Sequence, residues 1–250
     1  MVAKTKRDRE GLRRASAETA RLLSELSARA IPGSTTGTLD DYAASYILRI
    51  GGEPVFHTQN RFPGRINTSV NDEAVHGVPG KRVLHDGDLL KIDCGMRLKG
   101  YCGDATVTMG VGRPESLPAE RRAVMEAARE ALKRGVAAVE VGAHTGDIGH
   151  AMQTYVEALG FRLLAQFTGH GLGKRLWEEP SIPAVAPAGT GVRIVEHMVF
   201  TIEPIVVAGS PKTRVAADGW TVRVADGKPA AQFEHTVMAT KAGGQVLTWC

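Results

Sequence analysis

The chain has 250 residues, of which 43% are hydrophobic and 23% are charged, the composition of an ordinary globular protein with a sizeable core. No apolar run approaches the roughly 18 residues that a membrane-spanning helix needs, so we expect no membrane segment. The net charge of +4 permits contact with an anionic partner such as RNA. A solvated basic surface is the better explanation of that charge, and we expect no specific DNA binding.

The three cysteines (Cys94, Cys102 and Cys250) are an odd number without the C-x-x-C spacing of a metal site. This fits a reducing cytosol better than a disulfide framework. The N-terminus is basic, but acidic residues interrupt it and no apolar core of a signal peptide follows. We therefore expect a cytoplasmic protein with a flexible basic tail at residues 1–8 and a single domain at residues 9–250.

Two similar helical units are predicted. Residues 10–30 carry apolar side chains at helical spacing, and a second helix runs from Thr36 or Thr38 to Gly51. Later, a helix at residues 123–139 precedes another that runs from Thr145 to Gly160. Positions 37, 46 and 51 match positions 146, 155 and 160 as Gly, Tyr and Gly, at a constant offset of 109. This favours a duplicated half, with a pseudo-twofold axis and a site between the halves.

Strand-like sequence follows each helical pair. Residues 89–98 and 101–110 predict a hairpin that turns at Lys99-Gly100, and further strands are expected at 199–207, 221–224 and 232–240. In this register residue 95 faces 104 and residue 93 faces 106. Asp93 and Asp104 then lie diagonally on one face, within about 7–8 Å, where they repel unless a cation lies between them. A one-residue slip would separate them, and an acid that merely caps a turn is the alternative.

Three more residues extend this candidate set. His170 lies in the string GHGLG, whose glycines allow close backbone approach but do not have the spacing of a nucleotide-binding loop. Glu203 closes the apolar strand VFTI, and Glu234 is expected in mid-strand, where an unpaired charge would be costly. Four carboxylates and an imidazole in one place require a cation. We predict a pair of divalent metal ions, which can activate water and polarise a carbonyl for hydrolysis.

Two residues are candidates for proton transfer and charge stabilisation. Glu203 is placed to take a proton from the attacking water. His76, in the string NDEAVHGVP, could hydrogen-bond the scissile amide and stabilise a tetrahedral intermediate.

These strings together resemble the type I methionine aminopeptidases of the pita-bread metallopeptidase fold. The resemblance runs from about Arg9 to Thr248 and includes SVNDEAVHGVP, KIDCG, GYCGDAT, GHGLG, EEP, FTIEP, DGWTV and AQFEHT in the family's order. It implies an α/β (α+β) fold in which helices pack on the outer face of a curved antiparallel sheet. It also implies a metal-dependent methionyl aminopeptidase in which the five candidate ligands hold two divalent ions, with cobalt, manganese, iron or zinc as candidates.

The resemblance further implies that His76 is the family's first active-site histidine and that Trp220 is a wall of the methionine side-chain pocket. The expected substrates are N-terminal peptides of nascent chains, which implies work near the ribosome. We expect a monomer.

The chain departs from the family between GHGLG and EEP. There the family usually has an aromatic residue and then a second active-site histidine, whereas this chain has Leu176 and Trp177. An indole has one donor and no acceptor nitrogen. In the substrate pocket, Gln59, Phe62 and Asn67 stand where the family tends to show tyrosines and cysteines.

Three consequences of Trp177 are open. The first is that the same reaction runs at a lower rate. The second is that the cleft accepts a different N-terminal residue or a smaller peptide. The third is that the protein keeps its metals and binds peptides or the ribosome with weak turnover. An Xaa-Pro enzyme is a further alternative, disfavoured because the chain lacks the extra N-terminal domain common in proline-specific relatives.

Overall fold

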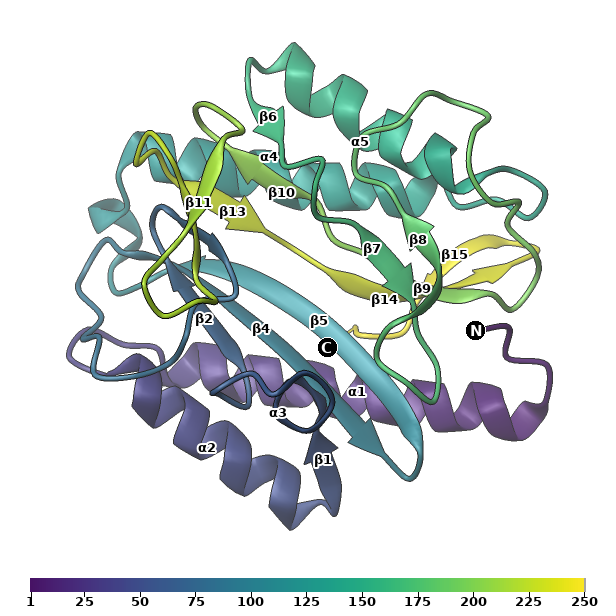
Figure 1. Ribbon diagram of the computed structural model, residues 1–250, viewed down its shortest axis with the longest axis horizontal. Helices are drawn as coiled ribbons and strands as arrows, with labels where there is room; N and C mark the ends of the chain where they lie inside the picture. Colours follow the sequence, from purple (N-terminus) through teal and green to yellow (C-terminus); the bar gives the residue numbers. More distant parts are fainter. Residues whose placement is uncertain (250) are drawn as a thin grey trace.

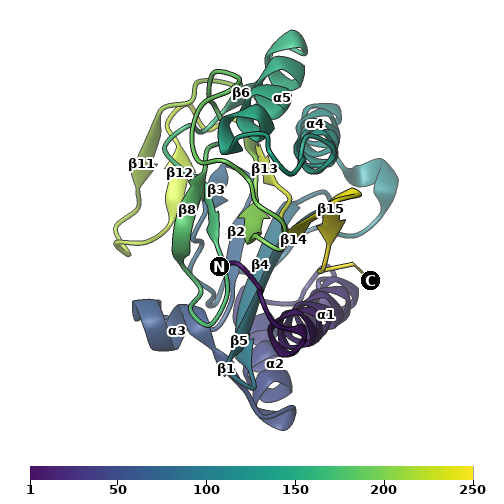
Figure 2. The same ribbon diagram turned by 90° about the vertical axis from the view of Figure 1, so that its right-hand side faces the viewer.

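The computed structural model describes residues 1–249, and Cys250 lies outside the described residues. Two pairs of helices lie on one side of a set of curved strands (Figures 1 and 2). The first pair is α1 (Lys6–Arg29) and α2 (Thr36–Arg49), the second is α4 (Ala119–Ala137) and α5 (Thr145–Ala158), and the shorter helices are α3 (Val55–Asn60) and a 3-10 turn (Pro114–Ser116). Within residues 1–249, none of the helices combines the length and the apolar character that a bilayer crossing requires.

The strands form antiparallel sheets. They are β1 (Gly52–Pro54), β2 (Asn67–Val70), β3 (Glu73–Val75), β4 (Leu89–Leu98), β5 (Tyr101–Gly110), β6 (Arg162–Leu163), β7 (Gly169–Gly171), β8 (Glu178–Ile182), β9 (Val199–Ile202), β10 (Ile205–Val207), β11 (Thr213–Val215), β12 (Val222–Val224), β13 (Ala230–Gln232), β14 (His235–Thr240) and β15 (Gly243–Val246). One sheet has the order β1-β4-β2 with β5 beside β4, and another has the order β15-β14-β9-β7-β8. Two smaller sheets, β13-β10-β6 and β11-β12-β3, complete the arrangement.

Helix α1 packs closely against the hairpin of β4 and β5. Leu12, Leu22 and Leu26 lie at helical spacing and are fully buried, so one apolar stripe of the helix faces the strands. The helix backbone also comes very close to β5, because a Cβ on Gly103 would lie 2.7 Å from the Cα of Ser16. Only glycine permits that approach, so the sequence fixes how near the helix layer lies to the strand that carries Asp104.

The duplication predicted from the sequence is present in the helices. Helices α2 and α5 are both 14 residues long and begin 109 positions apart, at Thr36 and Thr145. The pair α1 and α2 covers β4 and β5, while the pair α4 and α5 covers the strands of the second half (Figure 1). The expected mixed α/β architecture, with helices on one face of antiparallel strands, is confirmed.

The segment 1–8 differs from the flexible tail that we expected. Ala3 is fully buried and its N–H donates to the carbonyl of His197 at 2.8 Å. Helix α1 begins within the segment, and Thr5 and Asp8 cap it with reciprocal hydrogen bonds. Thr5 and Asp8 form a capping box, which is a helix-start signal in the sequence.

Two expected strands are interrupted next to a candidate ligand. The segment 199–207 divides into β9 and β10 at Glu203-Pro204, and Pro204 cannot donate to a strand ladder. The segment 232–240 begins earlier, as β13, and breaks at Phe233-Glu234 before β14. Glu234 therefore lies between two strands rather than in mid-strand.

Candidate metal centre

The hairpin of β4 and β5 places the first two acids as the sequence predicted. Gly95 pairs with Asp104 and Asp93 pairs with Thr106, which is the expected register. Asp93 is further oriented by Asn67 on the neighbouring strand β2, whose amide Nδ2 donates to Asp93 Oδ2 at 2.7 Å. Both carboxylates therefore sit on rigid, fully paired strands.

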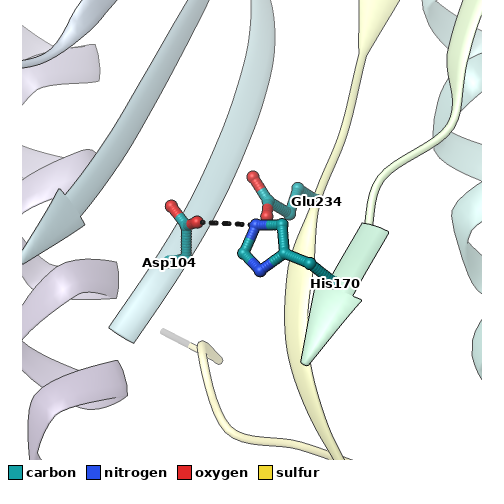
Figure 3. Close-up of side chains that lie close together, drawn as sticks. All are labelled: Asp104, His170 and Glu234. Atoms are coloured by element: carbon teal, nitrogen blue, oxygen red, sulfur yellow. Dashed lines mark ion pairs between the residues drawn. The ribbon is translucent and has the colours of Figure 1, made fainter. Parts of the chain in front are cut away.

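The second half of the chain brings the remaining candidate ligands to the same place. One donor atom each from Asp104, His170 and Glu234 lies within 4.8 Å of the others, and Figure 3 shows the three side chains converging from β5, β7 and the segment before β14. His170 Nε2 is 3.6 Å from Asp104 Oδ2 and 3.7 Å from Glu203 Oε1. The cluster therefore lies between the two halves of the fold.

The glycines that flank His170 are required by close backbone packing. A Cβ on Gly169 would lie 2.3 Å from the carbonyl oxygen of Thr201, and one on Gly171 would lie 2.1 Å from that of Glu179. These distances are far below van der Waals contact, so larger residues would push β7 away from β8 and β9. The string GHG thus fixes the position of the imidazole.

Threonine hydroxyls orient the glutamates of the cluster. Thr201 Oγ1 accepts from the N–H of His170 at 3.0 Å and donates to Glu203 Oε1 at 2.8 Å. Thr106 Oγ1 donates to Glu234 Oε2 at 2.8 Å, and the N–H of Glu234 donates to the carbonyl of Thr106 at 2.9 Å. The link between Thr106 and Glu234 joins the two halves directly at the cluster.

The electrostatics of this cluster are those of crowded acids removed from water. Burial raises the pKa of Glu203 to about 8 and that of Asp93 to about 6. Burial, reinforced by the neighbouring carboxylates, raises the pKa of both Asp104 and Glu234 well above the ordinary range. Burial also lowers the pKa of His170 to about 4, which keeps its imidazole neutral and able to act as a ligand.

Unpaired oxygens show that the residues fit a divalent cation. Asp93 Oδ1, Asp104 Oδ1 and Glu234 Oε1 are buried and have no hydrogen-bond partner among the described residues. An unpartnered buried carboxylate oxygen is costly, and a hard divalent ion that binds such oxygens removes both the desolvation penalty and the mutual repulsion. The donor set of carboxylates with one imidazole suits manganese, iron, cobalt or zinc.

The cluster lies on the floor of a cavity of about 270 Å³. All ten site residues predicted from the sequence line it: His76, Asp93, Asp104, His170, Glu203, Glu234, Phe62, Asn67, Trp177 and Trp220. Gln59, which the sequence also placed in the substrate pocket, does not line the cavity. Its side-chain oxygen instead accepts a hydrogen bond from the N–H of Leu176 at 3.3 Å. Asn67 lines the cavity, but its amide donates to Asp93, so it also orients a carboxylate.

Aromatic rings form the walls. Phe62 and Trp220 meet edge to face with centroids 5.4 Å apart. Trp177, which is 43% exposed, stacks on Phe56 at 6.5 Å and meets the ring of His170 at 6.1 Å. An indole therefore covers the side of the metal cluster on which the resemblance predicts a histidine.

Several lining residues were not predicted. They are Phe56, Asn60, Gln166, Phe167 and Thr168. Phe167 packs edge to face on the ring of His76 at 5.9 Å, and His76 itself has a backbone φ of 56°. Gln166, Phe167 and Thr168 directly precede the GHG string, which could have indicated them. Phe56 and Asn60 lie in the short helix α3, far from that string in the sequence.

The fold and the group of candidate metal ligands agree with the comparisons with known proteins. The chain belongs to metallopeptidase family M24, whose model matches residues 10–241, and it is therefore a member of a class of metal-dependent hydrolases.

Within that family, the chain is 40% identical over 248 residues to methionine aminopeptidase 1 of Bacillus subtilis, with 99% of each chain covered. The structure superposes with a TM-score of 0.95 on methionine aminopeptidase from Rickettsia prowazekii, at 33% identity and full coverage of both chains. It superposes equally well on the enzyme from Thermotoga maritima, with 99% of each chain covered. The predicted pita-bread fold is thereby confirmed.

Proposed function

We propose that this chain is an aminopeptidase that removes the N-terminal methionine from nascent proteins or peptides. The observation that carries the proposal is a cluster of acids and one imidazole on the floor of an aromatic-walled cavity. This cluster lies in a chain similar over nearly its whole length to methionine aminopeptidases.

Asp93, Asp104, His170, Glu203 and Glu234 are proposed to hold two divalent ions. The unpartnered oxygens of Asp93, Asp104 and Glu234 support this ligand set. When bound, such ions polarise a peptide carbonyl and lower the pKa of water toward neutrality. The chain itself then has to place the peptide, hold a proton and stabilise the developing negative charge.

Glu203 is proposed to hold the proton that the nucleophilic water gives up and to deliver it to the leaving amine. Its Oε1 is fixed by the hydroxyl of Thr201, so one carboxylate oxygen keeps a defined direction. Its side chain is only 15% exposed and lines the cavity, where a carboxylate can pass a proton from the water to the leaving amine.

His76 is proposed to donate a hydrogen bond to the carbonyl oxygen under attack. The imidazole lines the cavity and packs edge to face on the ring of Phe167. Desolvation by the cavity walls lowers its pKa, so the ring is neutral at physiological pH and has one N–H donor. A donor aimed at the developing charge lowers the barrier by about 3–4 kcal/mol in comparable sites.

The wall of Phe62 and Trp220 is proposed to bind the side chain of the N-terminal residue. Its two rings offer edges and faces to a flexible apolar side chain, and a thioether sulfur makes favourable contacts with aromatic rings. Methionine fits these walls better than a polar or branched residue.

A second candidate function is an aminopeptidase of other specificity, and Trp177 favours it. The indole stacks on Phe56 at the cavity and takes the place of a group that would donate to the substrate backbone. A bulky ring there restricts which peptides enter.

The test is the release of free amino acids from a panel of X-Ala-Ser peptides by metal-loaded protein. We expect methionine release that Glu203→Gln lowers by at least about 100-fold, with exposed Glu157→Gln on α5 as the matched control. Release of a different residue would support the second candidate. Loaded protein that releases nothing would contradict both.

We also propose that the protein works in the cytoplasm near the ribosome and that it is a monomer. Exposed basic side chains along α1, among them Lys6, Arg7 and Arg14, offer a surface for RNA. Cosedimentation with ribosomes that falls steeply between low and physiological salt would support this contact. Cosedimentation that Arg7→Glu and Arg14→Glu leave unchanged would contradict it.

A further inference from the structure

Lys91 is a fully buried lysine that the proposed reaction does not use. It lies in β4, two residues before Asp93, and only 2% of it is exposed. Its Nζ donates to the carbonyl oxygen of Asn71 at 2.8 Å and to that of Ala230 at 2.9 Å. A lysine is rarely this deeply buried unless its charge is well satisfied.

The side-chain nitrogen of Lys91 joins three segments that each lead to a candidate site residue. Lys91 shares its strand with Asp93, and Asn71 precedes β3, which leads to His76. Ala230 begins β13, which leads to Glu234. The two hydrogen bonds of Lys91 therefore connect the first half of the fold with β13 of the second half, which is followed by the candidate ligand Glu234.

The turn at Asn71 is held on every side, which makes it a rigid anchor. Asn71 has a left-handed φ of 58°. Its side chain donates to Asp88 Oδ1 at 2.8 Å and accepts from the N–H of Leu89 at 2.9 Å. Its carbonyl oxygen accepts from both Lys91 and the N–H of Ala230. Without Lys91 this carbonyl would keep only the bond from Ala230, which would loosen the backbone that leads to His76.

Stability alone does not explain a lysine at this position. An ammonium removed from water is costly even when hydrogen-bonded, and apolar side chains of similar volume often stabilise a fold as well or better. Methionine would fill the same space without any charge to desolvate. What methionine cannot do is bond two carbonyl oxygens from different halves of the chain at once.

We infer that Lys91 is a positioning residue that fixes His76 and Glu234 relative to Asp93 through the carbonyls of Asn71 and Ala230. This inference rests on the proposed function, in which His76 and Glu234 act on substrate and metal. Lys91 itself touches neither.

The test begins with Lys91→Met, measured for kcat, KM and divalent metal affinity, with Mn²⁺ as the calorimetric probe. We expect kcat on a Met-Ala-Ser peptide to fall about 10- to 100-fold with KM changed less than about 3-fold, since misplacement by about an ångström has effects of that size. Mn²⁺ affinity should fall by about 10-fold or more, as when outer partners of metal ligands are removed.

Two controls separate positioning from stability. Leu90→Ala opens a cavity on the opposite face of the same strand, against the helices, and it should lower the unfolding midpoint while leaving kcat within about 2-fold. In a double-mutant cycle, Lys91→Met should lower kcat much less in a His76→Ala background than in the wild type. The effects of residues that act as a unit are not additive. A kcat loss matched by Leu90→Ala, or full additivity with His76→Ala, would overturn the inference.

The metal measurement keeps this test independent of the proposed function. A wild-type protein that binds Mn²⁺ but releases no methionine would refute the function. In that case the Mn²⁺ affinity of Lys91→Met alone would test the inference, and an unchanged affinity would refute it. Unchanged Mn²⁺ affinity together with unchanged kcat would refute the role of Lys91.

Discussion

The buried acids of the metal cluster should make the metal-free protein less stable as pH rises. Burial raises the pKa of Glu203 from 4.5 to about 8, so the folded chain holds a proton that the unfolded chain has lost. Stability contributed by such a group is complete below the unfolded pKa and disappears as pH approaches the folded pKa. Asp104 and Glu234 have raised pKa values as well and act in the same direction.

The size of the effect follows from the pKa of Glu203. A rise of about 3.5 in pKa corresponds to about 5 kcal/mol over the whole range, and the part between pH 6.5 and 8 is about 2 kcal/mol. Below pH 6.5 the sign reverses for His170 and His235, whose pKa values burial lowers to about 4. Those histidines destabilise the fold as pH falls. Lys91, whose pKa burial lowers to about 7, opposes the acids between pH 6.5 and 8, so the part due to Glu203 is the difference between wild type and Glu203→Gln.

The assay is urea unfolding of chelator-treated protein at several pH values in that window. We expect the free energy of unfolding to fall between pH 6.5 and 8, with Glu203 accounting for about 2 kcal/mol of the acids' contribution. Added Mn²⁺ should restore it most strongly at pH 8, since the ion binds deprotonated carboxylates. Glu203→Gln should flatten the slope, while Glu157→Gln should leave it intact. A metal-free protein whose stability is constant or rises across this window would refute the reasoning.

Two further predictions concern side chains next to the cluster. Trp177→His should raise kcat for methionine release by about 10-fold or more, because it supplies a donor where the chain has an indole. Steady-state kinetics beside Trp177→Ala would check this, and equal rates for both variants would mean that the indole does not limit turnover. Thr106→Val should weaken Mn²⁺ binding by about 10- to 100-fold, because Glu234 loses the hydroxyl that orients it. Calorimetry would show this against Thr108→Val, whose hydroxyl bonds a backbone carbonyl instead, and equal affinities for the two variants would count against it.

The hairpin was predictable because its signal is local. A glycine turn fixes the register of two strands, and the register alone places Asp93 and Asp104 on one face. The helix repeat was predictable for a similar reason, since an offset of 109 positions is visible without any structure.

Features that depend on distant segments were not predictable in this way. Glu234 was expected in mid-strand, but its pairing with Thr106 across the two halves interrupts the strand. Phe167 comes from a loop without periodicity and gains its role only by packing on His76. Lys91 reads as an ordinary strand residue in KIDCG, because its two carbonyl partners lie 20 and 139 positions away.

The bridge between Thr106 and Glu234 has a consequence for the synthesis of this protein. The candidate ligands extend along the chain from Asp93 to Glu234, and the last of them is held by the first half of the fold. A chain still emerging from the ribosome therefore cannot assemble the cluster until residue 234 has been added and has paired with residue 106. With the proposed ligand set, metal uptake requires that both halves are made and joined, so a truncated or half-folded copy lacks a complete metal site.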